Sequence, residues 1–308
     1  MDDWLKNDSN RGYVIQLRER LTEGDVPVFI FLGAGLSFGV DRGRAMFEYH
    51  EFEDDGRFPS WDQLVKRMEG VLLSDPILSA HQESLQRFFK EQGALDCAEL
   101  FAHYIDGPNY WDFLARQFGS KPGDHDRLTA SHQALTRLPI KELFTTNYDE
   151  LIETAYRVKG SAVRVSSSPK EFLDNVAAVQ DIHLVKLHGT VQHPDTVVFT
   201  RSDFARSRSE RSQMFNHLVS RFQYSTFLFV GFSLTDPNFN ILFDEARYVR
   251  QGQNPTSFVV QGRQDPVYDA YLRSLGVNTI TLNSWDELPD FLEAINPSVD
   301  LMERLQPE

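Results

Sequence analysis

Short apolar runs alternate along the chain with segments in which apolar residues recur at helical spacing. The runs are rich in Val, Ile and Phe, which is typical of buried parallel strands. They lie at 26–32, 140–147, 163–165, 183–189, 197–200, 225–233, 257–262 and 277–282. Helical patterns lie at 11–23, 149–158, from Pro169 onward, and at 209–224, 236–250, 266–275 and 286–295. This alternation predicts an α/β fold with a doubly wound, mainly parallel, Rossmann-like sheet.

The pattern changes between the first two predicted strands. Residues 60–138 show helical spacing throughout, and Ser60 is the expected N-cap of the first helix there. Residues 38–59 have no clear period and are rich in charged and aromatic side chains, so we expect a mobile loop near the ligand. The chain is therefore expected to form a single domain, 1–308, with a helical insertion at 60–138.

Composition restricts the class of protein. The 308 residues are 41% hydrophobic, as in ordinary globular proteins, and no apolar run approaches the length of a membrane span. The first residues lack the basic and apolar regions of a signal peptide, so we expect a cytoplasmic protein with no membrane partner. One cysteine, Cys97, excludes an internal disulfide framework and a Cys-rich zinc module within this chain.

The charge is acidic. Lys and Arg number 31 against 45 Asp and Glu, which gives −14. Such a surface disfavours non-specific binding of nucleic acid, and we expect no direct nucleic-acid binding. A basic cluster of four arginines is the one candidate patch, and a solvated helix face is the favoured interpretation. Its members are Arg201, Arg206, Arg208 and Arg211.

Four polar motifs follow predicted strands. They are GAGLS at 33–37, TTNYD at 145–149, KLHG at 186–189 and GFSLTDPN at 231–238. Ligands of doubly wound sheets bind outside the carboxyl ends of the strands, where all four motifs are expected to lie. In the first motif, Gly33 and Gly35 allow a tight turn and a close ligand, and free N–H groups after the turn suit a pyrophosphate. A GAG-S match alone is weak, but four motifs in order are a strong signal.

TTNYD places hydroxyls, an amide and a carboxylate at the mouth of a strand. Asn147 can donate and accept at once, which suits the positioning of a ribose hydroxyl or a water. Asp149 lies where a helix begins, and the favoured interpretation of its own position is an N-cap. The threonines Thr145 and Thr146 are equally well explained as β-formers or as ligand contacts.

His188 is the candidate proton acceptor. It ends a strand beside Gly189, and an imidazole titrates near neutral pH. His183 lies within the strand and is interpreted as structural, and His193 lies in a turn. No Cys or Glu completes a familiar zinc spacing with these histidines, so no metal is expected.

In GFSLTDPN, Gly231 allows close approach, and Ser233 and Asn238 are candidates to bond the ribose that bears adenine. Asp236 is interpreted as a helix cap. Asn283, after the last strand, is either a contact to adenine or its ribose or a turn residue. A hydrolase nucleophile elbow is excluded because the G-x-S is not followed by the required Gly. The dinucleotide fingerprint is only partly met, so an ordinary dehydrogenase is not favoured.

Together these motifs resemble the sirtuin-like family, and more closely the bacterial sirtuin-like NAD hydrolases of antiphage defence, the group that includes the Thoeris-type effectors. The likeness spans about 26 to 295, in LPIKELFTTNYDELIE, KLHGTVQHP and FLFVGFSLTDPNF. It implies that NAD binds across the strand ends and that Asn147 and His188 are catalytic. It also implies nucleotide-binding positions at Gly33, Ala34, Gly35, Ser37 and Ser233. With Thr146, Asp149, Gly231, Asn238 and Asn283 these complete the candidate NAD site.

The resemblance implies hydrolysis of NAD to ADP-ribose and nicotinamide, which would deplete NAD in abortive infection. An NAD-dependent protein deacylase is disfavoured because one cysteine cannot make a four-cysteine zinc module, and because FGVDRGRAMFEYHEF replaces the usual GIPDFR form. A non-catalytic module that senses NAD or ADP-ribose, or a structural subunit, stays open. No sensor domain is visible after the last helix, so we expect a homo-oligomer, a co-encoded activating protein, or both.

Overall fold

The computed structural model describes residues 3–38, 40, 48–49, 52–53, 56–119, 127–177 and 181–301. Within these residues, seven strands form one sheet in the order β5-β6-β4-β1-β7-β8-β9, and every pairing is parallel. The strands are β1 Val28–Leu32, β4 Glu142–Thr145, β5 Val163–Ser166, β6 Ile182–Lys186, β7 Thr226–Val230, β8 Ser257–Gln261 and β9 Val277–Thr281. The predicted doubly wound α/β fold is confirmed.

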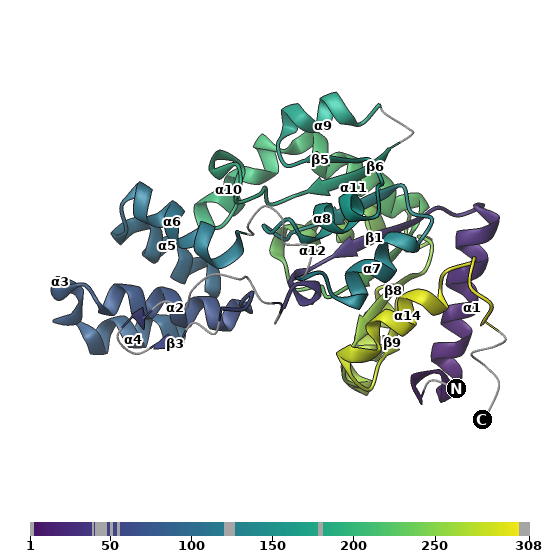
Figure 1. The fold of residues 1–308 in the computed structure, drawn as a ribbon, viewed down its shortest axis with the longest axis horizontal. Coiled ribbons are helices and arrows are strands. Elements are labelled where there is room, and N and C mark those ends of the chain that lie inside the picture. The colour runs from purple at the N-terminus through teal and green to yellow at the C-terminus, as the bar shows by residue number, and fades with distance from the viewer. Residues whose placement is uncertain are drawn as a thin grey trace.

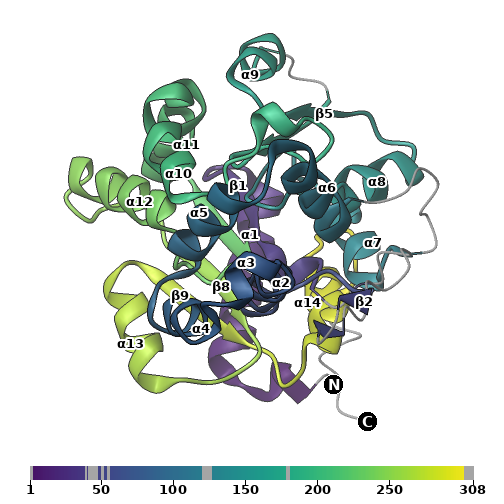
Figure 2. The same ribbon diagram turned by 90° about the vertical axis from the view of Figure 1, so that its left-hand side faces the viewer.

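Helices cover both faces of the sheet (Figures 1 and 2). One face carries α1 Asp8–Glu23, α7 Ala130–Arg137, α8 Leu151–Val158 and α14 Leu288–Ala294. The other carries α9 Pro169–Asn175, α11 Ser212–Tyr224, α12 Pro237–Val249 and α13 Pro266–Ser274. Successive side chains of a strand point to opposite faces, so on β1 Ile30 and Leu32 join the first core, while Phe29 and Phe31 join the second.

Five further helices form a separate layer beyond the carboxyl ends of the strands, which we call the helical block. They are α2 Trp61–Leu73, α3 Pro76–Ser79, α4 Gln82–Glu91, α5 Ala94–Tyr104 and α6 Gly107–Phe118. Figure 1 shows the block on the side of the molecule away from both termini. Ser60 caps α2 as expected, and Gln63 completes a reciprocal capping box. By contrast, α7 packs on α8 and α14 in the first core rather than in the block.

One local expectation is wrong. Residues 197–200 form no strand, because Phe199 is buried beside the block and Thr200 caps α10 Arg201–Glu210, the helix that carries most of the basic cluster. Within 38–59, where a loop was expected, a short antiparallel pair joins β2 Glu48–Tyr49 to β3 Phe52–Glu53. The remaining elements are single turns of 3-10 helix, η1 Asp3–Lys6, η2 Ala34–Leu36, η4 Pro194–Thr196 and η5 Trp285–Glu287. Whether 38–59 is mobile is not tested, because most of it lies outside the described residues.

The arginine cluster divides into two parts. Arg201 and Arg206 are exposed on α10, as expected for a solvated helix face. Arg211 is instead buried, and its guanidinium donates to the backbone oxygens of Ser167 and Thr196. Among the described residues, no helix is long and apolar enough to cross a membrane. The described residues also contain no group of three His, Cys, Asp or Glu side chains arranged to hold a metal ion.

Candidate active site

A cavity of about 610 Å³ lies between the sheet and the helical block, where β1, β4, β6 and β7 end. The chain leaves β1 toward β4, β5 and β6, and then returns on the other side of β1 as β7. The crevice between β1 and β7 is therefore the switch point at which doubly wound sheets bind ligands. Each of the four motifs contributes at least one residue to the cavity wall. Its volume falls within the range of about 300–1,000 Å³ usual for small-molecule sites.

Glycines allow the turns after β1 and β7 to pack against each other. A Cβ on Gly33 would lie 2.4 Å from the carbonyl oxygen of Gly231, and one on Gly231 would lie 2.5 Å from the amide nitrogen of Leu36. Gly231 also has a positive φ of 64°. Gly35 and Gly231 line the cavity, whereas Gly33 does not. At Gly33 the missing side chain therefore makes room for the backbone of the turn after β7, and not for a ligand as we expected.

The backbone of GAGLS is already largely hydrogen-bonded. The N–H groups of Gly33 and Gly35 donate to the carbonyl oxygens of Val230 and Gly231. Those of Leu36, Ser37 and Phe38 donate to carbonyl oxygens within the turn itself. The expected row of free N–H groups for a pyrophosphate is therefore not present here, because the turn uses them to hold its shape and to join β7.

Asn147 connects the turn after β4 to the turn after β1. Its side chain is 5% exposed, and Nδ2 donates to the Gly33 carbonyl oxygen at 3.1 Å and to Ser37 Oγ at 3.2 Å. Since a carbonyl oxygen can only accept, this contact fixes the orientation of the amide. Oδ1 is buried and has no partner among the described residues. An unpaired buried acceptor costs about 1–3 kcal/mol, so Oδ1 is poised to accept from a molecule in the cavity.

Asp149 and Ser37 extend this network beneath the cavity. Both are buried lining residues, and Ser37 hydrogen-bonds to the Asp149 carboxylate. Burial raises the pKa of Asp149, against the charge of Lys186 and the hydrogen bonds to the carboxylate. Asp149 Oδ1 also accepts from the Leu151 N–H at 3.0 Å. The expected N-cap position of Asp149 is wrong by one residue, because Glu150 occupies it, but the Asp149 carboxylate still satisfies the N–H of Leu151 at the start of α8.

His188 faces the same cavity from the end of β6 and is 3% exposed. Its ring lies edge-on to Phe204, with centroids 4.7 Å apart, and tilted against Tyr148 at 6.5 Å. Burial lowers the pKa of His188, Asp236 opposes this effect, and Arg211 adds to it. A lowered pKa keeps the imidazole neutral at neutral pH, which is the form that can accept a proton.

Asp236 is a site residue that the sequence analysis missed. Its Oδ1 accepts from the Phe239 N–H at 2.8 Å, which is the expected cap of α12. Its Oδ2 lies 3.5 Å from His188 Nε2. The turn brings it there through two residues with positive φ, Gly231 and Leu234. The sequence signal that could have identified Asp236 was its position in the motif after β7, because parallel strands such as β6 and β7 end at the same edge of the sheet.

The other candidates divide by position. Ala34, Thr146 and Ser233 line the cavity, and Ser233 Oγ pairs with Thr235 Oγ1 at 2.6 Å. The structure does not bring Asn238 or Asn283 to the cavity wall. Asn238 is buried and donates to Ser207 Oγ at 2.9 Å, so it fastens α12 to α10. Asn283 follows the edge strand β9 and bonds Glu287, which matches the turn-residue interpretation.

The helical block supplies the apolar side of the cavity. Phe58, just before α2, together with Trp61 and Phe118 of the block, lines it. Trp61 stacks on Phe199 at 5.5 Å, and Phe118 packs on Tyr148 at 4.9 Å, so these side chains join the block to the turns of the core. The cavity therefore has a polar floor at the strand ends and an aromatic cover, an arrangement suited to holding a polar ligand away from bulk water.

Comparisons with known proteins agree with this geometry. A family model described as a SIR2-like domain matches residues 141–280. The NAD(+) hydrolase ThsA of Enterococcus faecium is 32% identical over 228 residues, which cover 73% of this chain and 41% of that protein. The protein of the same name from Bacillus cereus is 29% identical over 189 residues, covering 56% and 40%.

Defense-associated sirtuin 2 of Bacillus subtilis is 22% identical over 303 residues, covering 94% of this chain and 27% of that protein. The chain thus spans about two fifths of the length of the ThsA proteins that it matches. The matched segment 141–280 includes three of the four motifs, and GAGLS precedes it. Part of the chain, residues 141–280, thus matches a SIR2-like domain, and the chain is similar to the ThsA hydrolases.

Proposed function

We propose that this chain hydrolyses NAD to ADP-ribose and nicotinamide, and that it acts as an antiphage defence effector that depletes NAD when activated. One observation carries the proposal: Asn147 and His188, from neighbouring strand ends, line one cavity, the first with an unpartnered buried acceptor and the second with a lowered pKa. The printed names of the ThsA relatives support the choice of NAD as substrate.

The bond that breaks joins the nicotinamide nitrogen to C1′ of its ribose. The bonding electrons pass to the pyridinium ring, so nicotinamide leaves neutral and needs no proton. Positive charge then builds on the ribose as an oxocarbenium-like cation. Water adds to C1′ and loses a proton, which gives ADP-ribose. The protein must therefore orient the ribose, admit one water and exclude the rest.

The residues divide this work among them. Neutral His188 accepts the proton from the water or from a ribose hydroxyl, and Asp236 beside it stabilises the imidazolium that forms. Asn147 Oδ1 accepts a hydrogen bond from the ribose hydroxyl or the water, while its Nδ2 stays fixed on Gly33 and Ser37. The remaining binding energy comes from the adenosine and pyrophosphate parts, which hold the reacting carbon in place.

We assign the binding of NAD to the other candidate residues of the cavity wall, apart from Asn147 and His188. They are Ala34, Gly35, Ser37, Thr146, Asp149, Gly231 and Ser233. Phe58, Trp61 and Phe118 would cover the bound dinucleotide from the block.

The test is incubation of the purified protein with NAD, with free nicotinamide and ADP-ribose measured by chromatography, alone and with an acyl-lysine peptide. Release of nicotinamide without peptide supports hydrolysis. Turnover that requires the peptide would establish a deacylase. Tight binding of NAD without turnover, in every assembly tested, would leave a sensing module.

We further propose that the activity is latent in the isolated, cytoplasmic chain and is released by self-association or by a co-encoded partner. An unrestrained NAD hydrolase would drain its own cell, and the block that covers the cavity is the natural element to move, by a shift between closed and open populations. Light scattering beside an NAD assay across protein concentration tests this. A monomer with full, concentration-independent activity contradicts it.

A further inference from the structure

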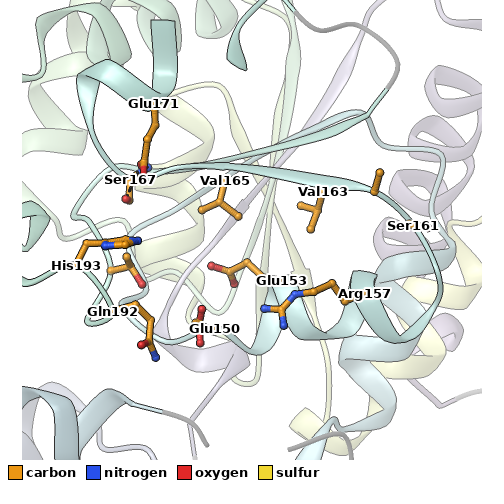
Figure 3. A pocket seen from close by; sticks show the side chains of 12 residues that line it. Glu150, Glu153, Arg157, Ser161, Val163, Val165, Ser167, Glu171, Gln192 and His193 are labelled. Carbon is orange, nitrogen blue, oxygen red and sulfur yellow. Dashed lines mark hydrogen bonds between the residues drawn. The ribbon is translucent and has the colours of Figure 1, made fainter. Parts of the chain in front are cut away.

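A second cavity, of about 380 Å³, lies against α8 and the edge strand β5 (Figure 3). The turn that follows β6 closes its remaining side, through Thr190, Gln192 and His193. It shares no lining residue with the candidate active site. Its volume is still large enough for a small ligand. The proposed hydrolysis of NAD uses none of its lining side chains.

The most unusual group in this cavity is the carboxylate of Glu153. The residue is 3% exposed, and Oε1 accepts from Lys186 Nζ at 2.8 Å. Oε2 is buried and has no partner among the described residues. Figure 3 shows the carboxylate pointing into the cavity. A buried carboxylate oxygen without a donor is costly, and a donor bound in the cavity would satisfy it while Lys186 stays on Oε1.

The surroundings of Glu153 favour a positively charged donor. Glu150 and Glu171 also line the cavity. Burial would raise the pKa of Glu171, but hydrogen bonds from Ser167 and Ser168 outweigh burial and lower it, so this carboxylate stays charged. Arg157 lines the cavity as well, but it is exposed and solvent screens its charge. No ion pair links Arg157 to Glu153 in the part of the chain that the structure describes.

The shape and the donors together select the class of ligand. Val163 and Val165 lie two residues apart on β5, so their side chains share the face of the strand that lines the cavity. They offer an apolar wall beside the acidic side chains. A metal ion needs several ligating groups, and the described residues provide no such set here. An organic cation needs only one or two carboxylate oxygens for its head and an apolar surface for its hydrocarbon part.

We propose that this cavity binds a small organic cation with an ammonium or guanidinium head, which pairs with Glu153 Oε2 and Glu150 while its hydrocarbon part lies on Val163 and Val165. The cavity is then a second ligand site, next to the buried Lys186 that joins Glu153 to the backbone oxygen of Asp149. This places the site directly behind the TTNYD and KLHG turns.

Ligand-observed NMR tests the proposal without any need for NAD turnover, so its outcome is independent of the proposed function. The probes are n-butylammonium and n-butylguanidinium, with n-pentanol as the neutral control of similar size. We expect both cations to bind at millimolar concentration and pentanol not to bind. Glu153→Gln should weaken the cations about tenfold or more, as for loss of a hydrogen bond to a charged group. Glu83→Gln, on the exposed surface of α4, is the matched control and should have no effect.

Two further variants protect the test against misfolding, because Glu153→Gln leaves Lys186 buried without its charge partner. Glu150→Gln keeps that pair and should weaken the cations several-fold. Val165→Phe also keeps the pair, and it should abolish binding by filling the cavity. Equal binding of pentanol and the cations, cation affinity unchanged in the Glu150 and Val165 variants, or no cation binding to the wild type would each overturn the proposal and leave Oε2 to a water molecule.

Discussion

Asn147→Ala is the sharpest test of the candidate active site, because the contacts of Nδ2 separate the structural contribution of this residue from the catalytic one that we propose for Oδ1. Its Nδ2 bonds the Gly33 carbonyl oxygen and Ser37 Oγ, but both keep a second partner. Gly33 still accepts from the Leu36 N–H, and Ser37 still bonds Asp149. Neither group is orphaned, and the truncation also removes the unpaired Oδ1, so the loss of stability is no more than the low end for a buried hydrogen bond, about 1 kcal/mol. In a domain of this size it corresponds to a fall in Tm of about 2 °C.

The catalytic cost is expected to be much larger. Oδ1 is the part of the side chain that has no partner among the described residues, so we expect it to interact with substrate or water. Loss of one preorganised polar group of this kind lowers kcat by about 100- to 1,000-fold. Affinity for NAD should fall only slightly, because the adenosine and pyrophosphate supply most of the binding energy.

Asn238→Ala is the matched control. It removes a second buried asparagine, whose Nδ2 also donates to a serine hydroxyl, but this side chain fastens α12 to α10 and does not line the cavity. We expect a comparable fall in Tm with kcat within a few-fold of the wild type. Calorimetric titration of NAD, nicotinamide release and thermal unfolding would be measured on all three proteins.

Turnover of NAD by Asn147→Ala within a few-fold of the wild type would exclude a catalytic role for Asn147. Equal losses of activity in Asn147→Ala and Asn238→Ala would exclude it as well. A large loss of affinity with unchanged kcat would instead make Asn147 a simple binding residue.

Three further predictions concern titratable side chains. His188→Ala should lower NAD turnover by about 100- to 10,000-fold with little change in thermal unfolding, and turnover close to the wild type would exclude it as the base. Asp236→Asn keeps the α12 cap but removes the carboxylate whose charge raises the pKa of His188 against the effect of burial. The acid limb of the pH profile of kcat/KM should therefore move to lower pH. An unmoved limb would mean that His188 and Asp236 do not interact. Burial would raise the pKa of Glu142, but hydrogen bonds from His183 and His217 and the charge of Arg221 outweigh it and lower the pKa from 4.5 to about 2. Because the pKa is lower in the folded state, the charged carboxylate stabilises the fold above about pH 4.5, and this stabilisation is lost as the pH falls toward 2. Glu142→Gln should therefore lower the free energy of unfolding in urea by about 3 kcal/mol at pH 7 and by less at low pH. A difference that does not change with pH would contradict this linkage.

The sheet and the location of the site could be predicted because both follow from local pattern. Apolar runs of strand length between amphipathic helices permit few arrangements, and parallel strands place their carboxyl ends at one edge. Asn147 and His188 follow directly from that rule. The strand expected at 197–200 shows the limit of this rule, since packing of Val197 and Phe199 against the helical block gives the same apolar run as a strand.

Contacts between distant residues could not be predicted in this way. Asp236 and Asn238 are two residues apart in one motif, but the first bends toward His188 and the second toward α10. Arg211 belongs to a basic run, but its guanidinium is buried because it donates to two backbone oxygens, one in η4 and one just after β5. Such outcomes depend on which segments meet in space, and local periodicity contains no information about that.

The same distinction bears on how the site is controlled. The polar floor belongs to the sheet, whereas the aromatic cover belongs to the block, and the proposed hydrolysis would need both because the cover would exclude water. The block meets the core through surface contacts such as Arg201 with Asp96, which contribute little, and through the ring of Tyr148 against Phe118. Tyr148 lies between Asn147 and Asp149 in the chain, so its contact with Phe118 links the block to the turn that holds Asn147. Under the proposed function, a small movement of the block would change both the dryness of the cavity and the position of Asn147, and assembly would switch the activity in this way.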